Sequence, residues 1–83
     1  MICIGDVTTW DTGCNHLTQA RKVIEEANEV AQAVALGEGR DRVLEECADT
    51  VQAACNLVAR IGVEDFRPFM ELCERRNRER GRL

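Results

Sequence analysis

Aromatic side chains are scarce in this sequence: its 83 residues include no tyrosine, one tryptophan and two phenylalanines. A chain of this length buries only about 60–65% of the surface that its unfolded form exposes, so a large core is excluded. We therefore expect a single domain over residues 1–83 that is completed by association with further copies, as a homodimer or a homotetramer.

Patterns typical of secreted and membrane proteins are also missing. The five cysteines are odd in number and form no C-x-x-C pair, which favours a reducing cytoplasmic location over a disulfide scaffold. No apolar run approaches the roughly eighteen residues of a membrane span, and the N-terminal M-I-C-I-G-D lacks the basic start of a signal peptide. We expect no membrane association.

Charge is present but divided unevenly. Residues 1–66 carry twelve acidic and five basic residues, whereas residues 67–83 carry six arginines and three glutamates. Arginines gathered at one end of an acidic protein do not form the basic face that nucleic acids require, so we expect no nucleic-acid binding. The basic tail, residues 76–83, is interpreted either as solvated or as a phosphate contact.

The remaining pattern is helical. Asn15 to Thr18 are good N-terminal residues for a helix that runs to about Leu36, and Asp41 is expected to cap a second helix that ends at Ile61. Glu64 and Asp65 are expected to cap a third helix, with Pro68 in its first turn. Because Gly37-Glu38-Gly39 is short and flexible, the first two helices should form an antiparallel hairpin. The prediction is an all-α antiparallel helical bundle with an irregular segment over residues 1–14.

Acidic residues recur at the same spacing in the first two helices. E-E-A-N-E is followed after sixteen residues by E-C-A-D, so Glu26 with Glu29, and Glu46 with Asp49, lie one turn apart beside an apolar stripe. In a hairpin the two pairs can face one another, and four converging carboxylates repel unless a cation neutralises them. Oxygen ligands without histidine or cysteine favour a hard ion, Mg²⁺ foremost and Mn²⁺ next.

These blocks resemble a known signature. E-E-x-x-E, sixteen residues, then E-x-x-D is similar to the motif of the all-α nucleoside triphosphate pyrophosphatase superfamily, and V-I-E-E-A-N-E-V with L-E-E-C-A-D is most similar to its MazG-like members. The resemblance extends from Ala20 to Gly81. It implies a nucleotide substrate and Mg²⁺-dependent hydrolysis of a nucleoside triphosphate to a monophosphate and pyrophosphate.

The resemblance also implies roles for individual residues. The metal ligands would be Glu26, Glu29, Glu46 and Asp49. Glu25 or Glu26 would be the catalytic carboxylate that accepts the proton of the attacking water. For substrate binding, Asn77 and Arg80 match residues that contact the triphosphate, although Cys73 stands where a lysine is common. Lys22 and Trp10 are further substrate-binding candidates, the latter by stacking on a base.

Two other interpretations stay open. One is the phosphoribosyl-ATP pyrophosphatase branch of the same superfamily, whose K-K-V-x-E-E-A-x-E and E-x-A-D-L blocks are similar to Lys22–Glu29 and Glu46–Val51. This chain has Thr50-Val51-Gln52-Ala53 where Tyr-His often follows the second block. The other is a non-catalytic dimerisation module, in which the carboxylates are ordinary solvated side chains and Trp10 serves packing.

Overall fold

Helix α1, His16–Ala35, begins where the sequence predicts a capping residue. The computed structural model describes residues 1–83, and in it Asn15 Oδ1 accepts a hydrogen bond from the Thr18 backbone N–H at 2.8 Å. The helix ends in a turn at Gly37, whose φ of +64° suits a residue without Cβ. The predicted start, the predicted end and the Gly37–Gly39 turn are thereby confirmed.

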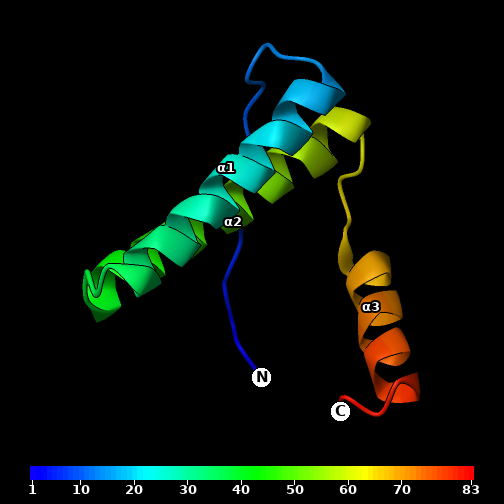
Figure 1. Cartoon of the computed structure of the whole chain (residues 1–83). Helices are drawn as coiled ribbons and strands as arrows, with labels where there is room; N and C mark the ends of the chain where they lie inside the picture. Colours follow the sequence, from blue (N-terminus) through cyan, green and yellow to red (C-terminus); the bar gives the residue numbers. More distant parts are fainter.

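Helix α2, Arg40–Ile61, runs back antiparallel beside α1 and forms with it the predicted hairpin (Figure 1). The N-cap is Gly39, which makes no side-chain cap, so the prediction of Asp41 at this position is wrong. The helix starts directly after Gly39, whose φ is +99°, and this places Asp41 inside its first turn. There its negative charge still complements the helix dipole.

Helix α3, Arg67–Glu79, stands apart from the hairpin. Its N-cap is Phe66, so the prediction of Glu64 and Asp65 at this position is wrong, although Asp65 Oδ1 accepts a hydrogen bond from the Arg67 backbone N–H at 3.1 Å. Pro68 lies in the first turn, as predicted. The fold is all-α with three helices and no strand, which confirms the predicted class. However, only α1 and α2 pack against each other, and Figure 1 shows α3 directed away from the hairpin.

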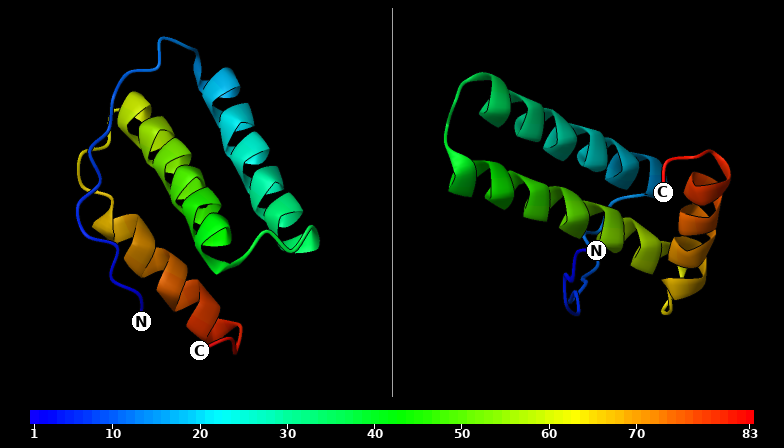
Figure 2. Two further views of the ribbon diagram at one scale, coloured as in Figure 1. Left: turned by 90° about the vertical axis from the view of Figure 1, so that its left-hand side faces the viewer. Right: turned by 90° about the horizontal axis from the view of Figure 1, so that it is seen from below.

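The N-terminal segment, residues 1–14, is extended and lies along α2 rather than beyond the end of the hairpin (Figure 2). Three contacts fasten it there. The Thr8 carbonyl accepts from Gln52 at 2.9 Å, the Trp10 backbone N–H donates to Asn56 at 3.3 Å, and Asp11 forms an ion pair with Arg60 at 3.3 Å. This segment becomes one wall of the groove described below.

Very little apolar surface is enclosed by one chain. Only Ala33 and Ala53 are buried hydrophobic residues, and the large side chains of the α1 stripe are open, Ile24 at 61% and Val34 at 62%. The chain exposes 6755 Å², whereas a compact protein of 9.3 kDa exposes about 5,000 Å². None of the three helices has the length and apolar character needed to cross a membrane.

Candidate active site

Three of the predicted carboxylates converge between the two packed helices. One oxygen each from Glu26 of α1 and from Glu46 and Asp49 of α2 lie within 4.8 Å of one another. We call these three residues the acidic cluster. They meet because the face of α1 that contacts α2 is centred on Gln19, Glu26 and Ala33, not on the apolar stripe. The E-x-x-D pair of α2 thus meets one member of the E-x-x-E pair of α1, whereas the sequence predicts that both pairs converge in full.

Glu46 is the buried member of the acidic cluster, with a relative exposure of 3%. Its Oε1 forms an ion pair with the Arg42 guanidinium at 2.6 Å, one helical turn earlier. Its Oε2 is buried and has no hydrogen-bond partner. Leaving a carboxylate oxygen buried and unpaired is costly, so the environment of this atom fits that of a metal ligand.

The neighbouring groups change the acidity of Glu46. The pKa of Glu46 is raised, first by the Glu29 carboxyl, which can share a proton with it, and next by burial. Arg42 acts in the opposite direction and lowers the pKa, while the negative charges of Glu29 and Asp49 add to the increase. A cation at this position would neutralise the negative charges that raise this pKa.

The other predicted carboxylates lie outside the three-residue cluster. Glu29 is exposed and adjoins Glu46, as the effect on the pKa of Glu46 shows, but it is not among the three converging groups. Glu25 is exposed and contributes neither to the acidic cluster nor to the groove beside it. Of the two candidate proton acceptors, Glu26 alone belongs to both.

A groove of about 450 Å³ opens beside the acidic cluster, between α1, α2 and the N-terminal segment. Its size suits a nucleoside, since small-molecule sites occupy roughly 300–1,000 Å³. We call it the substrate groove. Its lining comprises Trp10, Thr12, Cys14, Thr18, Gln19, Lys22, Glu26, Asp49, Gln52, Ala53 and Asn56.

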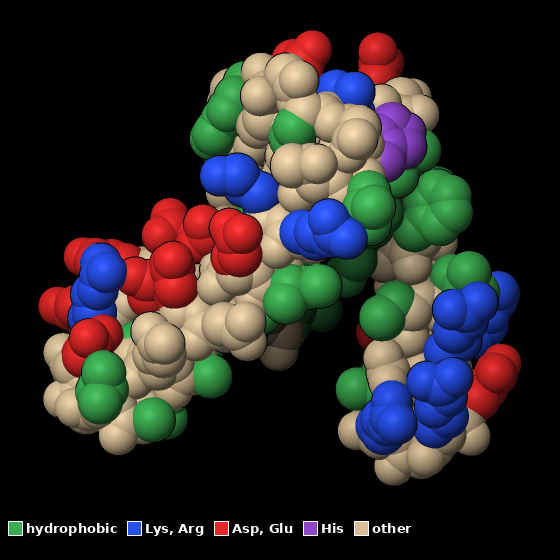
Figure 3. All heavy atoms as spheres, turned by 45° about the horizontal axis from the view of Figure 1, so that its top comes forward, with side chains coloured by type: hydrophobic (Ala, Val, Ile, Leu, Met, Phe, Trp, Pro, Cys, Tyr) green, Lys and Arg blue, Asp and Glu red, His purple; other side chains and the backbone are tan.

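Two of the four predicted substrate contacts lie in the substrate groove. Trp10 is 57% exposed, so its ring is not consumed by packing, and Lys22 brings an ammonium group to the same lining as Glu26. Asn77 and Arg80 belong to α3 and its C-terminal end, which make no contact with the hairpin. Figure 3 shows the same separation as charge, with acidic side chains over the hairpin and basic ones over α3.

Sequence reasoning missed the amide side chains of the substrate groove. Gln19 and Asn56 are among the five buried residues, at 1% and 4% exposure, and Gln52 hydrogen-bonds to Asn56 at 3.0 Å. The signal was present in V-Q-A-A-C-N-L-V, where two amides spaced four apart interrupt an apolar stretch. Arg42 was missed too, although it precedes Glu46 by four residues.

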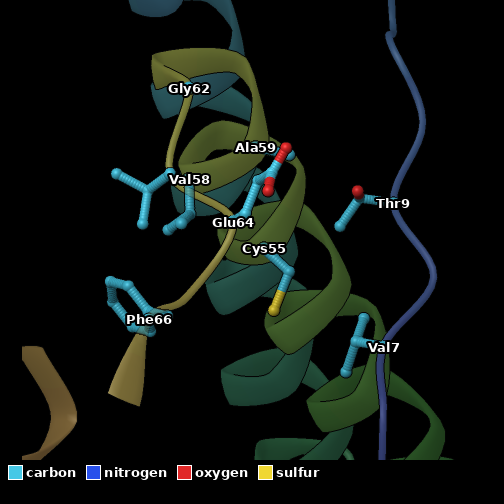
Figure 4. Close-up of a pocket in the computed structure, with 9 residues that line it drawn as sticks. Val7, Thr9, Cys55, Val58, Ala59, Gly62, Glu64 and Phe66 are labelled. Atoms are coloured by element: carbon cyan, nitrogen blue, oxygen red, sulfur yellow. The ribbon is translucent and has the colours of Figure 1, made fainter. Parts of the chain in front are cut away.

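A second hollow carries no such chemistry. It has a volume of about 560 Å³ and is lined mainly by apolar side chains of the N-terminal segment, the end of α2 and the loop that follows. Figure 4 shows Val7 and Thr9 on one side of it and Val58 and Phe66 on the other. One carboxylate, Glu64, provides no convergent site, so this hollow is part of the uncovered apolar surface.

The comparison with protein families agrees with this geometry. The family described as phosphoribosyl-ATP pyrophosphohydrolase matches residues 9–77, which include the acidic cluster and every residue of the substrate groove. The chain belongs to the phosphoribosyl-ATP pyrophosphohydrolase family. Comparison with curated proteins and with solved structures gives no match.

Membership in the phosphoribosyl-ATP pyrophosphohydrolase family supports the superfamily resemblance of the two acidic blocks. It also makes the chain an enzyme, a hydrolase that acts on a phosphoanhydride, rather than a non-catalytic dimerisation module. The residues present fit a hard divalent cation: the cluster offers only oxygen atoms, and the buried Oε2 of Glu46 has no other partner.

Proposed function

We propose that this protein is a Mg²⁺-dependent nucleotide pyrophosphohydrolase, which converts a nucleoside triphosphate to the monophosphate and pyrophosphate. The observation that carries the proposal is the convergence of Glu26, Glu46 and Asp49 at one side of a groove of nucleoside size. A polyanionic substrate cannot approach bare carboxylates, so a metal-binding cluster beside a base-sized groove is the arrangement that a nucleotide needs.

The acidic cluster, with Glu29 adjoining it, would hold the metal. Bound there, Mg²⁺ or Mn²⁺ supplies charge neutralisation for the phosphates and a water of lowered pKa. The protein's own contribution is to hold the carboxylates in place: Arg42 engages Oε1 of Glu46, so that Oε2 remains available. Glu26, which belongs to both the cluster and the groove, is the proposed proton acceptor, with exposed Glu25 as the second candidate.

The remaining predicted residues would bind the substrate. Lys22 lies in the same lining as Glu26, where an ammonium group would pair with a phosphate oxygen. Trp10, in the wall formed by the N-terminal segment, would stack on the base or the ribose. Asn77 and Arg80 are proposed to contact the distal phosphates from the α3 of a second copy, because α3 does not contact the hairpin of its own chain.

The proposed assembly is a homodimer or homotetramer. One chain exposes about a third more surface than a compact protein of its mass, and this excess includes Leu17, Ile24 and Val34 of α1. Its radius of gyration is 14.3 Å, compared with about 12 Å for a compact domain of this length. Both differences are explained if a second copy covers the apolar stripe of the hairpin.

A second candidate substrate is phosphoribosyl-ATP, which contains the same triphosphate. The family match over residues 9–77 favours it. Gln52 and Ala53 stand where this branch often has Tyr-His, which favours the common nucleoside triphosphates instead. The two proposals share their metal site and their bond cleavage, and differ in what fills the substrate groove.

Pyrophosphate release tests the proposal directly. The purified protein is incubated with phosphoribosyl-ATP and with the common nucleoside triphosphates, with Mg²⁺ present and after chelation. We expect a monophosphate and pyrophosphate in a ratio of one to one, and only with the metal. Release of inorganic phosphate without pyrophosphate, or turnover that survives chelation, would contradict the proposed reaction.

A further inference from the structure

Asn56 is held in one orientation by a backbone N–H that it contacts directly and by a backbone carbonyl that orients its neighbour Gln52. Its Oδ1 accepts the Trp10 backbone N–H at 3.3 Å and the Gln52 side-chain amide at 3.0 Å. The Gln52 amide also donates to the Thr8 carbonyl at 2.9 Å. A backbone N–H can only donate and a carbonyl can only accept, so neither amide can be flipped without losing a contact.

This network leaves one amide group unused. Both acceptor contacts of Asn56 fall on Oδ1, and its NH₂ group donates to no protein atom, although the residue is 4% exposed. The one side-chain atom that is both buried and unpaired is Oε2 of Glu46, so the NH₂ group of Asn56 is reached by solvent and is free to donate to a ligand. Asn56 lines the substrate groove, so the unused donor belongs to the wall that a ligand would touch.

The position of Asn56 relative to the metal-binding residues indicates which part of a nucleotide it meets. The groove lining includes Glu26 and Asp49 of the acidic cluster, Lys22, and the ring of Trp10. Phosphates are required beside the carboxylates and the ammonium group, because metal and cation neutralise them there. The aromatic and amide part of the lining is left for the base.

We propose that Asn56 determines base specificity by donating a hydrogen bond to the Watson–Crick edge of the substrate base. The inference rests on the proposed nucleotide pyrophosphohydrolase function. Because its orientation is locked, Asn56 offers a donor and never an acceptor. It therefore favours a base with an acceptor at the contacted position over one that presents a hydrogen there, and the mismatch leaves buried polar groups unpaired.

Two nucleotide pairs test this discrimination in the wild-type protein. ATP and ITP differ only at the Watson–Crick edge, where donor and acceptor exchange places, and the same holds for CTP and UTP. We expect kcat/KM to differ by at least about tenfold within the pair that is turned over. Equal kcat/KM within both pairs would overturn the inference while leaving the pyrophosphohydrolase function intact.

The substitution Asn56→Asp replaces the NH₂ donor of this side chain by an oxygen acceptor. The aspartate keeps an oxygen for the Trp10 N–H and the Gln52 amide, and replaces the free donor by an acceptor. Its added charge lowers binding of both members of a pair alike, so the ratio of the two kcat/KM values isolates the hydrogen bond. We expect the wild-type preference to collapse or reverse. The unfolding midpoint, measured in parallel, records the separate cost of burying a carboxylate, which cancels in the ratio.

Asn28→Asp is the matched control, since Asn28 is exposed on α1 and does not line the groove. It should leave the ratio unchanged. An unchanged ratio in Asn56→Asp, or turnover confined to phosphoribosyl-ATP, whose N1 is already substituted, would overturn the inference alone. Absence of both hydrolysis and Trp10 fluorescence change with every nucleotide would overturn the proposed function as well.

Discussion

At the scale of single residues, Glu46 is under opposing demands. Burial and the Glu29 carboxyl raise its pKa, while the Arg42 ion pair lowers it, and one of its oxygens has no partner. A group chosen only for stability would be neutral and fully hydrogen-bonded. Retaining a carboxylate here is understandable if the residue is a ligand, because the cation then repays the cost of keeping the group charged.

The first prediction concerns removal of one ligand. Glu46→Gln or Asp49→Asn should abolish Mg²⁺-dependent hydrolysis, with a loss of activity of at least about a hundredfold. Mutation of residues that only hydrogen-bond to metal ligands already lowers activity by about ten- to a hundredfold. The apo fold should be as stable as before or slightly more so, since carboxylate repulsion is relieved. Pyrophosphate release and circular dichroism are the measurements.

Glu45→Gln is the matched control for that experiment. Glu45 adjoins Glu46 in the chain and also pairs with Arg42, at 3.2 Å, but its side chain is 65% exposed and outside the cluster. It makes the same change of charge and should retain activity. Full activity in Glu46→Gln would remove this residue from the metal site, and loss of its helical signal would make it structural.

The second prediction is a pH dependence of the metal-free protein. Because the pKa of Glu46 is raised above its ordinary value of 4.5, the folded state binds this proton more tightly than the unfolded state. The resulting stability is complete below that value and is lost as pH rises through the raised pKa. Asp65 does not interfere, since its pKa is lowered and its contribution is lost only at still lower pH.

Thermal unfolding in chelator, measured from about pH 4.5 toward neutrality, should therefore show a falling midpoint that is traceable to this group. Glu46→Gln should remove that component, because it carries no titrating carboxyl. Mg²⁺ should also reduce it, since a bound cation favours the deprotonated carboxylate. An identical slope in the wild type and in Glu46→Gln would show that another group is responsible.

At the scale of elements, the sequence predicts well where the helices begin and end. It predicts less well which face of each helix is buried. Asn15, Gly37 and Gly62 end or begin helices through local chemistry, which depends only on neighbouring residues. Periodicity finds the apolar stripes but does not say what covers them. In the structure α1 meets α2 through Gln19 and Glu26, and the stripe that contains Ile24 is left open.

The difference between local signals and long-range contacts also explains which parts of the candidate site were predictable. The acidic cluster depends on two helices joined by a short turn, so spacing alone brings Glu26 to Glu46. The amide wall depends on an extended segment that returns across α2, and residues 1–14 carry no periodic signal that would predict this path. Trp10 was a candidate because of its residue type. Asn56 could be recognised only from the structure, where it accepts a hydrogen bond from the Trp10 backbone.

The third prediction concerns α3. Truncation before Asn77 should lower kcat/KM by roughly ten- to a hundredfold or more, because a charged hydrogen bond to phosphate is worth about 1.5–3 kcal/mol. The affinity of the apo protein for Mg²⁺ should not change, since the acidic cluster lies entirely on α1 and α2. Steady-state kinetics and metal titration separate the two effects.

The control for α3 is a shorter truncation after Arg80, which removes only the last three residues and keeps both proposed phosphate contacts. It loses the side-chain hydrogen bond from Arg82 to Asn77, at 3.0 Å, and the backbone hydrogen bonds from Gly81 to Arg78 and from Arg82 to Asn77, but no residue of α3. This chain should behave as the wild type. Kinetics of the longer truncation that match the full chain would leave α3 as a solvated helix without a role at the phosphates.

At the scale of the whole molecule, charge and apolar surface are distributed as an assembly would need them. The hairpin is acidic and α3 basic, and they are held apart within one chain (Figure 3). The exposed stripe of α1 and the apolar side chains of α3, including Phe69 at 54% and Met70 at 56%, have no partner. Association would cover both and would bring arginines of one copy toward carboxylates of another.

The fourth prediction is therefore that the protein sediments as a dimer or larger at micromolar concentration. The excess of exposed surface over a compact monomer, about 1,700 Å² per chain, exceeds the roughly 800 Å² that each partner buries in a standard interface.

Ile24→Glu places a charge in the middle of the α1 stripe and should weaken association at least about tenfold, because burying an unpaired charge is costly. Gln32→Glu, exposed on another side of the same helix, is the matched control and should leave the mass unchanged. A folded monomer of 9.3 kDa under these conditions would contradict the prediction, and α3 would then have to reach the substrate groove of its own chain for Asn77 and Arg80 to contact the phosphates.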